Sequence, residues 1–556
     1  MNPLPAAPNI ALMTRTFNLA DLFEVVAHTV PDRIAFVCGA QRLSYRALDE
    51  RATRLASALQ AQGLRRGDHV GIALFNSAQY LEAFLACCKI GAVPANINYR
   101  YVAGELGFLL QSLDLKALFF EASLAPAVAP VLPGVATLRW PVCVRSPAGS
   151  AAPFAGALDY ESLLASGSDH LTDPERSDQD RYLLCTGGTT GMPKGVIWTH
   201  RALFMGALGG GGIYQQLPPI AQAQDLAERV ALAPHLTFLA IAPMMHGAAL
   251  WSSLISLFAG HTVVVSEQTH FDAAHIWTVV QNESVNVMTV VGDSMALPLV
   301  QALEAEPARW ALDSLMIFGN GGAMLSGHLQ ARLLALLPQL YLSNGMGSSE
   351  TGVVGGGERP AQGEGFMVLK ARPDLAVLSD DLRILRTPGE RGVLARTGHT
   401  PMGYYGDAPK TAEVFVTIDG VLWVRSGDQA RIDEQGDIVV LGRDSQCITT
   451  GGEKVFTEEV EEVLRRDPAV ADVLVVGLPD ARWGQQVTAV VALAHGAQLD
   501  PAALLAMSRQ HLAGYKIPKA VYVAPAIRRS DAGKADYRWA LEFAKAQADS
   551  MPAPSA

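Results

Sequence analysis

The chain is 556 residues long, which exceeds the size at which one hydrophobic core stops growing, so we expect at least two domains. Hydrophobic residues make up 49% and charged residues 17% of the chain, a composition that argues against intrinsic disorder. The formal net charge of -11, without a long Lys/Arg cluster, argues against nucleic acid as a partner but leaves small anionic ligands open.

Residues 17–120 alternate amphipathic helical segments with short apolar strands. The helical segments include RALDERATRLASALQAQG and AQYLEAFLACCKIGAV, and HVGIALF lies between them as a strand. This alternation predicts an α/β fold in which helices cover a largely parallel sheet. The next stretch, residues 143–180, is rich in Ser, Ala, Gly and Asp and predicts an irregular surface connection.

A glycine- and threonine-rich loop, TGGTTGMPKG, follows at residues 186–195. Its glycines allow successive N–H groups to point into one concavity and bind phosphate oxygens, while threonine hydroxyls and a lysine add donors and charge. The spacing differs from a Walker A loop, and the flanks YLLC and GVIWT both predict strands, whereas a Walker loop opens into a helix. The alternative is an ordinary flexible turn. The predicted phosphate-binding residues are Thr186, Gly187, Gly188, Thr189, Thr190, Gly191 and Lys194.

No Lys, Arg, Asp or Glu occurs from Val230 to Ser266, a length that would suffice for a membrane span. Prolines and glycines, among them Pro243 and Gly260, divide this segment into short pieces. We therefore predict buried strands and a pocket-lining helix, and no transmembrane segment.

Short strands with Gly and Pro turns predict a small β-rich subdomain at residues 380–443. After Gly442-Arg443 the pattern becomes compact α+β, so we place a boundary there, with domains at 1–443 and 444–556. In the second domain Thr457 is a sensible N-cap for the acidic helix that follows.

The six cysteines show no CxxC spacing, and the N-terminus lacks a basic start followed by a sustained apolar stretch. Both features favour reduced thiols in a cytoplasmic protein over disulfides, a metal site or secretion.

The loop TGGTTGMPKG resembles the signature loop of the adenylate-forming superfamily: acyl-CoA synthetases, peptide-synthetase adenylation domains and beetle luciferases. Gly187 replaces the usual Ser. The resemblance covers nearly the whole chain. It implies a large N-terminal adenylation domain of helix-covered, mostly parallel sheets plus the β-rich subdomain, followed by a small mobile α+β domain, with ATP, Mg²⁺ and coenzyme A as cofactor and co-substrates.

Three further motifs are similar to the family's nucleotide site. FGNGGAML would line the adenine pocket, and in NGMGSSETG the resemblance assigns Ser349 to phosphate and Glu350 to magnesium, while Met346 stands where an aromatic residue is usual. Arg425-Ser426-Gly427-Asp428 would bind the ribose through its Asp, with Arg443 as its partner. Residues added to the ATP or AMP site are therefore Gly321, Gly322, Ala323, Met346, Gly347, Ser349, Asp428 and Arg443.

The C-terminal motifs imply the catalytic cycle. Ser445 stands at the family's hinge position, and residues Gly451, Gly452, Glu453 and Lys454 match the loop of the coenzyme A tunnel. Lys534, in AGKADY, matches the adenylation lysine. We thus take Lys534, Glu350 and Thr189 as catalytic. As bare patterns, the predicted tunnel loop would be only a helix start, and Lys534 would be only a solvated surface lysine.

The acyl pocket implied by resemblance comprises Met245, His246, Gly247, Trp251 and Gly321. His246 either borders this pocket or is a satisfied core residue. PMMHGAALW contains no Asp to hold an amino acid's ammonium group, which argues against peptide-synthetase chemistry. We predict an acyl-CoA synthetase for a hydrophobic acid of fatty or steroid-side-chain type. An acyl-AMP ligase for a protein thiol, or a catalytically silent nucleotide- or acyl-binding protein, are the alternatives. We leave a homodimer open.

Overall fold

The computed structural model describes residues 15–101, 103–144, 154, 156–172, 175–186, 193–214, 216–323, 325–356, 367–443, 446–450, 453–480, 483–512, 514–529 and 534–550. The chain divides into two compact units. Unit 1 comprises residues 1–235 and 253–263, and unit 2 comprises residues 236–252 and 264–556. The domain boundary predicted near residue 444 stays a prediction.

Unit 1 contains a sheet with strands in the order β9-β8-β4-β3-β5-β6-β7. All neighbours from β8 to β7 are parallel, and only β8 and β9 are antiparallel. The predicted parallel α/β layer is therefore confirmed. The strands are β3 (His69–Ala73), β4 (Val93–Asn96), β5 (Ala117–Glu121), β6 (Trp140–Val144), β7 (Leu158–Asp159), β8 (Arg181–Thr186) and β9 (Lys194–Thr199).

Several helices of unit 1 begin at a side chain that caps them. Ser44 accepts a hydrogen bond from Ala47 N at the start of α2, and Ser77 accepts one from Tyr80 N at the start of α3. A β1–β2 hairpin precedes α2. The elements are α1 (Leu19–Thr29), β1 (Ile34–Cys38), β2 (Gln41–Ser44), α2 (Tyr45–Gln62), α3 (Ala78–Lys89), α4 (Ala103–Ser112), α5 (Ala125–Val128), α6 (Tyr160–Ala165), α7 (His200–Gly206) and α8 (Asp225–Leu232).

The connection at residues 143–180 is more ordered than its composition predicts, because it contains β7 and α6. Asp159 caps α6 by accepting from Ser162 N at 3.0 Å. The ring of Tyr160 is buried, and its hydroxyl donates to Glu82. One buried aromatic residue thus attaches a polar segment to the core.

The charge-free segment forms short elements, as predicted: β10 (Thr237–Ala240), α9 (Gly247–Phe258) and β11 (Thr262–Val265). Leu250, Leu254 and Leu257 of α9 are fully buried. Among the described residues, no helix is long and apolar enough to cross a membrane.

The first sheet of unit 2 has the strand order β15-β14-β13-β12-β10. Strands β10 to β14 are parallel, and β15 is antiparallel to β14. The carboxyl ends of parallel strands share one edge, where ligands of open α/β sheets bind. The elements are α10 (Ala273–Asn282), β12 (Val287–Val290), α11 (Gly292–Ala305), β13 (Ile317–Gly321), α12 (Gly327–Leu336), β14 (Tyr341–Ser348) and β15 (Gly352–Gly356).

The predicted β-rich subdomain is a sheet of the order β16-β23-β22-β19-β17-β18, with β21 paired to β22. Every pairing in it is antiparallel. Its elements are β16 (Met367–Leu369), β17 (Leu375–Leu378), β18 (Ile384–Leu385), β19 (Arg391–Arg396), β21 (Phe415–Ile418), β22 (Val421–Ile432) and β23 (Ile438–Arg443). Between β19 and β21 the chain forms β20 (Gly403–Tyr404), which is not a strand of this sheet, and α13 (Ala408–Val414).

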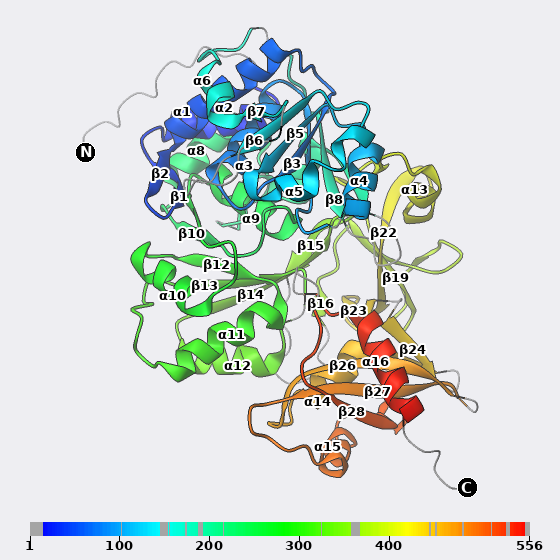
Figure 1. The fold of residues 1–556 in the computed structure, drawn as a ribbon. Coiled ribbons are helices and arrows are strands. Elements are labelled where there is room, and N and C mark those ends of the chain that lie inside the picture. Colours follow the sequence, from blue (N-terminus) through cyan, green and yellow to red (C-terminus); the bar gives the residue numbers. More distant parts are fainter. Residues whose placement is uncertain are drawn as a thin grey trace, which may run out of the picture. The chain divides into compact units, whose positions relative to one another are not determined.

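The C-terminal part of unit 2 is the expected compact α+β fold, a sheet of order β25-β24-β27-β26 with β28 beside β27 (Figure 1). The predicted cap of its first helix is wrong: α14 begins at Thr457 itself, and the N-cap is Phe456, without a side-chain hydrogen bond. Thr457 is instead buried. The elements are β24 (Cys447–Thr450), β25 (Glu453–Phe456), α14 (Thr457–Leu464), β26 (Val470–Asp480), β27 (Gly484–Leu493), α15 (Pro501–Ser508), β28 (Ala520–Ala524) and α16 (Tyr537–Ser550).

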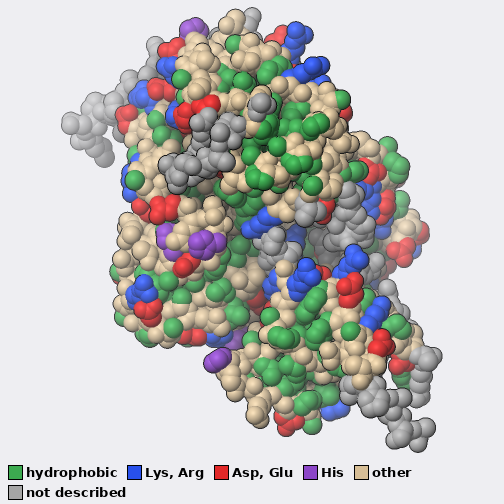
Figure 2. Space-filling view, viewed as in Figure 1, with side chains coloured by type: hydrophobic (Ala, Val, Ile, Leu, Met, Phe, Trp, Pro, Cys, Tyr) green, Lys and Arg blue, Asp and Glu red, His purple; other side chains and the backbone are tan. Residues whose placement is uncertain are grey.

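Charged side chains of both signs are interspersed over the face seen in Figure 2. Among the described residues drawn on this face, Lys and Arg form no continuous basic stripe of the kind that follows a nucleic-acid backbone.

Candidate active site

The glycine- and threonine-rich loop connects two antiparallel strands, β8 and β9, with Thr186 directly opposite Lys194. The next helix, α7, begins only at His200, after the whole of β9. The prediction that both flanks are strands is confirmed, and the strand-to-helix geometry of a Walker loop is absent from them. The predicted phosphate-binding residues Gly187, Gly188, Thr189, Thr190 and Gly191 lie outside the described residues.

A buried asparagine fixes the end of β8 next to this loop. Asn96, at the end of β4, donates to the Cys185 carbonyl at 3.1 Å and accepts from Cys185 N at 2.8 Å. Its side chain is almost fully buried. The sequence analysis missed Asn96, because only the pairing of β4 with β8 brings it to the loop.

In unit 2 the predicted adenine residues lie at adjacent strand ends. Gly321 ends β13 and is paired with Gly345 of the parallel strand β14, one residue before Met346. Gly322 follows with a φ of 84°, a backbone conformation that favours glycine. The two motifs, 25 residues apart between Gly321 and Met346, therefore meet at one edge of the sheet.

Two buried asparagines hold this edge together. Asn320 accepts from Gly292 N at 2.8 Å, donates to the Ala323 carbonyl at 3.0 Å, and donates to Asn344 Oδ1 at 3.3 Å. Both asparagines are 7% exposed. They lie inside the quoted motifs FGNGGAML and NGMGSSETG, but the sequence analysis gave them no role. Their hydrogen bonds hold the backbone at the strand end that we predict to contact adenine.

The loop with Glu350 is a tight hairpin between β14 and β15. Ser348 Oγ accepts from the backbone N–H groups of Glu350 and Thr351, at 3.3 and 3.1 Å, and Ser348 N donates to Thr351 Oγ1 at 3.1 Å. Gly347 faces the Gly352 carbonyl so closely that a Cβ would lie 2.2 Å from its oxygen. These contacts fix the backbone of the turn that carries Glu350.

Met346 is partly buried and packs against the core cluster of the β-rich subdomain, which includes Val354 and Leu369. A thioether is flexible enough for such a contact and for a flat ligand beside it. Its contact with adenine stays a prediction.

Glu350 is half-buried and accepts a hydrogen bond from the hydroxyl of Tyr404 at 2.9 Å. Burial, and then the neighbouring Glu350 carboxylate, raise the pKa of Tyr404 well above its usual value, so its hydroxyl remains a donor. Beyond the turn, the buried Arg396 donates to the carbonyls of Thr351 and Val353 at 2.7 and 2.8 Å. The sequence analysis identified neither Tyr404 nor Arg396.

The donor set fits a magnesium ion that arrives with a nucleotide. Within the described ranges, no group of three or more His, Cys, Asp or Glu side chains forms a metal cluster. Mg²⁺ retains water and is typically bound by one or two carboxylates together with substrate phosphates, and the loop supplies one such carboxylate in Glu350.

The predicted ribose pair occupies neighbouring strands. Asp428 of β22 is directly opposite Arg443 of β23 in the antiparallel register. Asp428 is 7% exposed, and its N–H donates to Ser426 Oγ at 3.0 Å. The two residues are 15 positions apart in sequence, and strand pairing brings their backbones opposite each other.

The C-terminal candidates are only partly described. Lys534 is exposed between β28 and α16, next to a bridge that pairs Arg529 with Ala535. Glu453 and Lys454 begin β25 opposite Thr450 and Thr449. Ser445, Gly451 and Gly452 lie outside the described residues.

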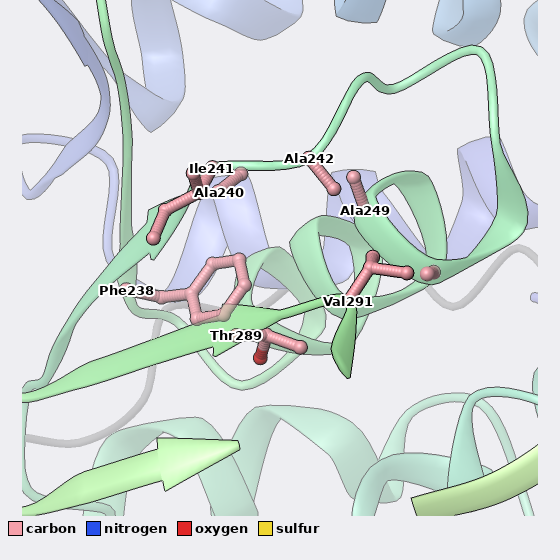
Figure 3. Close-up of a pocket in the computed structure, with 8 residues that line it drawn as sticks. Phe238, Ala240, Ile241, Ala242, Ala249, Thr289 and Val291 are labelled. Atoms are coloured by element: carbon pink, nitrogen blue, oxygen red, sulfur yellow. The ribbon is translucent and has the colours of Figure 1, made fainter. Parts of the chain in front are cut away.

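An apolar pocket lies at the carboxyl ends of β10 and β12 in unit 2, where the first turn of α9 closes it (Figure 3). The space among its side chains is about 190 Å³, part of it open to solvent, and it is too narrow to hold a water-sized sphere. The hydroxyl of Thr289 is its one polar side-chain group among the lining residues. These are Phe238, Ala240, Ile241, Ala242, Ala248, Ala249, Thr289 and Val291.

The predicted acyl residues border the same elements without lining this pocket. His246 directly precedes α9, its N–H donates to the Pro243 carbonyl at 3.0 Å, and Met245 before it is fully buried. Gly247 is the first residue of α9, and Trp251 is buried one turn further along. The prediction of a pocket-lining helix in this segment is confirmed through Ala248 and Ala249.

Comparisons with known proteins agree with this arrangement. The family model of AMP-binding enzymes matches residues 23–405, and that of the AMP-binding enzyme C-terminal domain matches residues 459–534. The chain is 41% identical to the medium-chain acyl-CoA ligase Mig of Mycobacterium avium, over 96% of this chain and 99% of that protein. It is 39% identical to the medium/long-chain-fatty-acid–CoA/3-oxocholest-4-en-26-oate–CoA ligase of Mycobacterium tuberculosis, over 96% of this chain and 97% of that protein.

Among solved structures, an anthranilate CoA ligase, AuaEII, in complex with anthranoyl-AMP is similar to this chain with a TM-score of 0.81. The match covers 97% of this chain and 99% of the other at 19% identity, so it supports the fold alone.

Proposed function

The chain belongs to the family of AMP-binding enzymes, and from this premise we propose that it is an ATP-dependent ligase that joins a hydrophobic carboxylic acid to coenzyme A. The observation that carries the proposal is near-full-length similarity to two acyl-CoA ligases. Two features of the structure support it. The predicted phosphate loop connects the antiparallel strands β8 and β9, and the two predicted adenine motifs meet at one edge of a sheet.

The substrate class is a fatty acid or a steroid-side-chain acid. The pocket at the start of α9 supports this choice, because seven of its eight lining residues are apolar and four of them are alanines. Such a surface gains free energy by covering hydrocarbon, about 25 cal/mol for each Å² removed from water. It offers no charge for an ammonium or a second carboxylate.

The first step makes the acid reactive. A carboxylate oxygen attacks the α-phosphorus of ATP, an acyl-adenylate forms, and pyrophosphate leaves. Lys534 places a cation between the carboxylate and the α-phosphate, where negative charge gathers in the transition state. Asp428 accepts the ribose hydroxyls beside Arg443, and the Asn320 network shapes the strand end along which adenine lies.

Magnesium, when bound with ATP, neutralises phosphate charge, and Glu350 would hold it. The chain's own contribution is a carboxylate in a tight hairpin, with one oxygen bound by Tyr404.

In the second step the coenzyme A thiol attacks the acyl carbon of the mixed anhydride, the thiol proton is lost to solvent, and AMP leaves. From the family resemblance we infer that the loop with Gly451 and Gly452 serves this step and that Ser445 is the hinge. No enzyme nucleophile is needed. This agrees with six free cysteines, four of which are buried, and with burial raising the pKa of Cys185 to about 12.

A reduced thiol set also supports the cytoplasm as the location.

The test is a thioester assay with the purified chain, ATP, Mg²⁺ and coenzyme A, over straight-chain acids of increasing length and 3-oxocholest-4-en-26-oate. We expect AMP release that depends on both the acid and coenzyme A. ATP–pyrophosphate exchange without thioester formation would favour a protein thiol as acceptor, and no exchange with any acid would refute the ligase.

A further inference from the structure

Glu350 is held by an element far from it in sequence, the segment Gly403–Tyr404 that forms β20. Tyr404 Oη donates to Glu350 Oε1 at 2.9 Å, across 54 positions of sequence. A carboxylate oxygen has two lone pairs, so this bond takes up one acceptor position on Oε1 and fixes where that oxygen lies. Both acceptor positions of Oε2 are left by this bond, which makes Oε2 the better oxygen for a ligand.

The donor itself is firmly placed. Tyr404 N donates to Thr411 Oγ1 at 3.0 Å, and its ring meets Phe415 edge-on with 5.8 Å between centroids. Gly403 before it has a φ of 142°, and a Cβ there would lie 2.5 Å from Thr411 Cγ2. The contacts with Thr411 of α13 thus fix the backbone at Tyr404, and the contact with Phe415 of β21 positions its ring, so that the donor can orient the acid it binds.

The backbone of the Glu350 hairpin is held by the same subdomain. Arg396, at the end of β19, donates to two carbonyls that follow Glu350, and its guanidinium lies 3.5 Å from Asp374. Arg396 therefore orients the hairpin, while Tyr404 orients the side chain. The hydrogen bond from Tyr404 then restricts the rotation of the Glu350 carboxylate.

We propose that Tyr404 is a positioning residue for the metal-binding step, which holds Oε1 of Glu350 so that Oε2 faces the cation that accompanies ATP. This inference rests on the proposed function. Tyr404 does not contact the reacting atoms in this proposal. Removal of its hydroxyl should therefore weaken cation binding, while the adenylation step still proceeds once the cation is bound.

The test variant is Tyr404→Phe, which keeps the ring and removes the hydroxyl. Loss of a hydrogen bond to a charged group predicts an apparent Mn²⁺ affinity about tenfold weaker in the presence of a non-hydrolysable ATP analogue, measured by electron paramagnetic resonance. In ATP–pyrophosphate exchange the half-saturating Mg²⁺ concentration rises by the same factor, and the rate recovers at high Mg²⁺. Tyr341→Phe, at the exposed beginning of β14, is the matched control and changes neither quantity.

A double-mutant cycle separates positioning from general damage. In a Glu350→Gln background, Tyr404→Phe causes no further loss of Mn²⁺ affinity if it acts through that carboxylate. Unchanged Mn²⁺ affinity in Tyr404→Phe, or an equal loss in both backgrounds, overturns the inference. A wild-type chain that binds no nucleotide–Mn²⁺ complex would refute the proposed function instead.

Discussion

Glu121 offers a test of the structure that depends on pH. It ends β5, is 8% exposed, and accepts a hydrogen bond from Phe75 N at 3.3 Å. Burial raises its pKa to about 7, from an ordinary value of 4.5, against the weaker lowering by that hydrogen bond. The perturbation is Glu121→Gln, which keeps an acceptor for Phe75 and cannot ionise.

The sign follows from proton binding. Because the folded pKa lies above the unfolded one, the folded protein holds the proton more tightly, and the stability that the neutral acid gives is lost as pH rises toward 7. A shift from 4.5 to about 7, at 1.36 kcal/mol per pH unit, is worth about 3 kcal/mol, of which about 2.5 kcal/mol is lost between pH 5 and pH 8. The wild type should lose this amount relative to Glu121→Gln.

The assay is thermal unfolding of both proteins at several pH values, because the comparison cancels every other titrating group. For a unit of this size, about 2.5 kcal/mol corresponds to a change of roughly 5–10 °C in the difference between the two Tm values. Glu50→Gln, an exposed carboxylate on α2, is the control and should show no such trend. A Tm difference that is the same at pH 5 and pH 8 would refute the reasoning.

Three further predictions concern the proposed reaction. Lys534→Ala should lower ATP–pyrophosphate exchange by about 10²–10³-fold yet spare thioester formation from supplied acyl-adenylate, and equal loss of both steps would contradict the assigned role. Ala249→Leu fills the pocket and should lower kcat/KM for the longest accepted acid by about 10–100-fold with shorter acids spared, unlike the exposed Ala305→Leu. Asn320→Ala leaves Gly292 N without its acceptor, so we expect a loss of about 1–3 kcal/mol in stability and a higher KM for ATP, and an unchanged KM would remove Asn320 from the nucleotide site.

Much of the fold was predictable because periodicity and capping are local. The helices α2 and α3, the strands β8 and β9, and the α+β pattern after residue 444 follow from side chains within a few positions of one another. Local rules failed where a distant contact decided the outcome. At α6, the contact between Tyr160 and Glu82 orders a segment whose composition indicates a loop.

The sequence by itself determined the kind of residues at the site: glycines and hydroxyls for phosphate, one acid for a cation, and a lysine near the end. Only the tertiary structure decided which partners orient them. Asn96 beside the loop strand, Asn320 with Asn344, and Tyr404 on Glu350 arise from strand pairing and packing between segments far apart in the chain. A hydrogen bond needs two groups within about 3 Å, and a linear order of residues does not contain that distance.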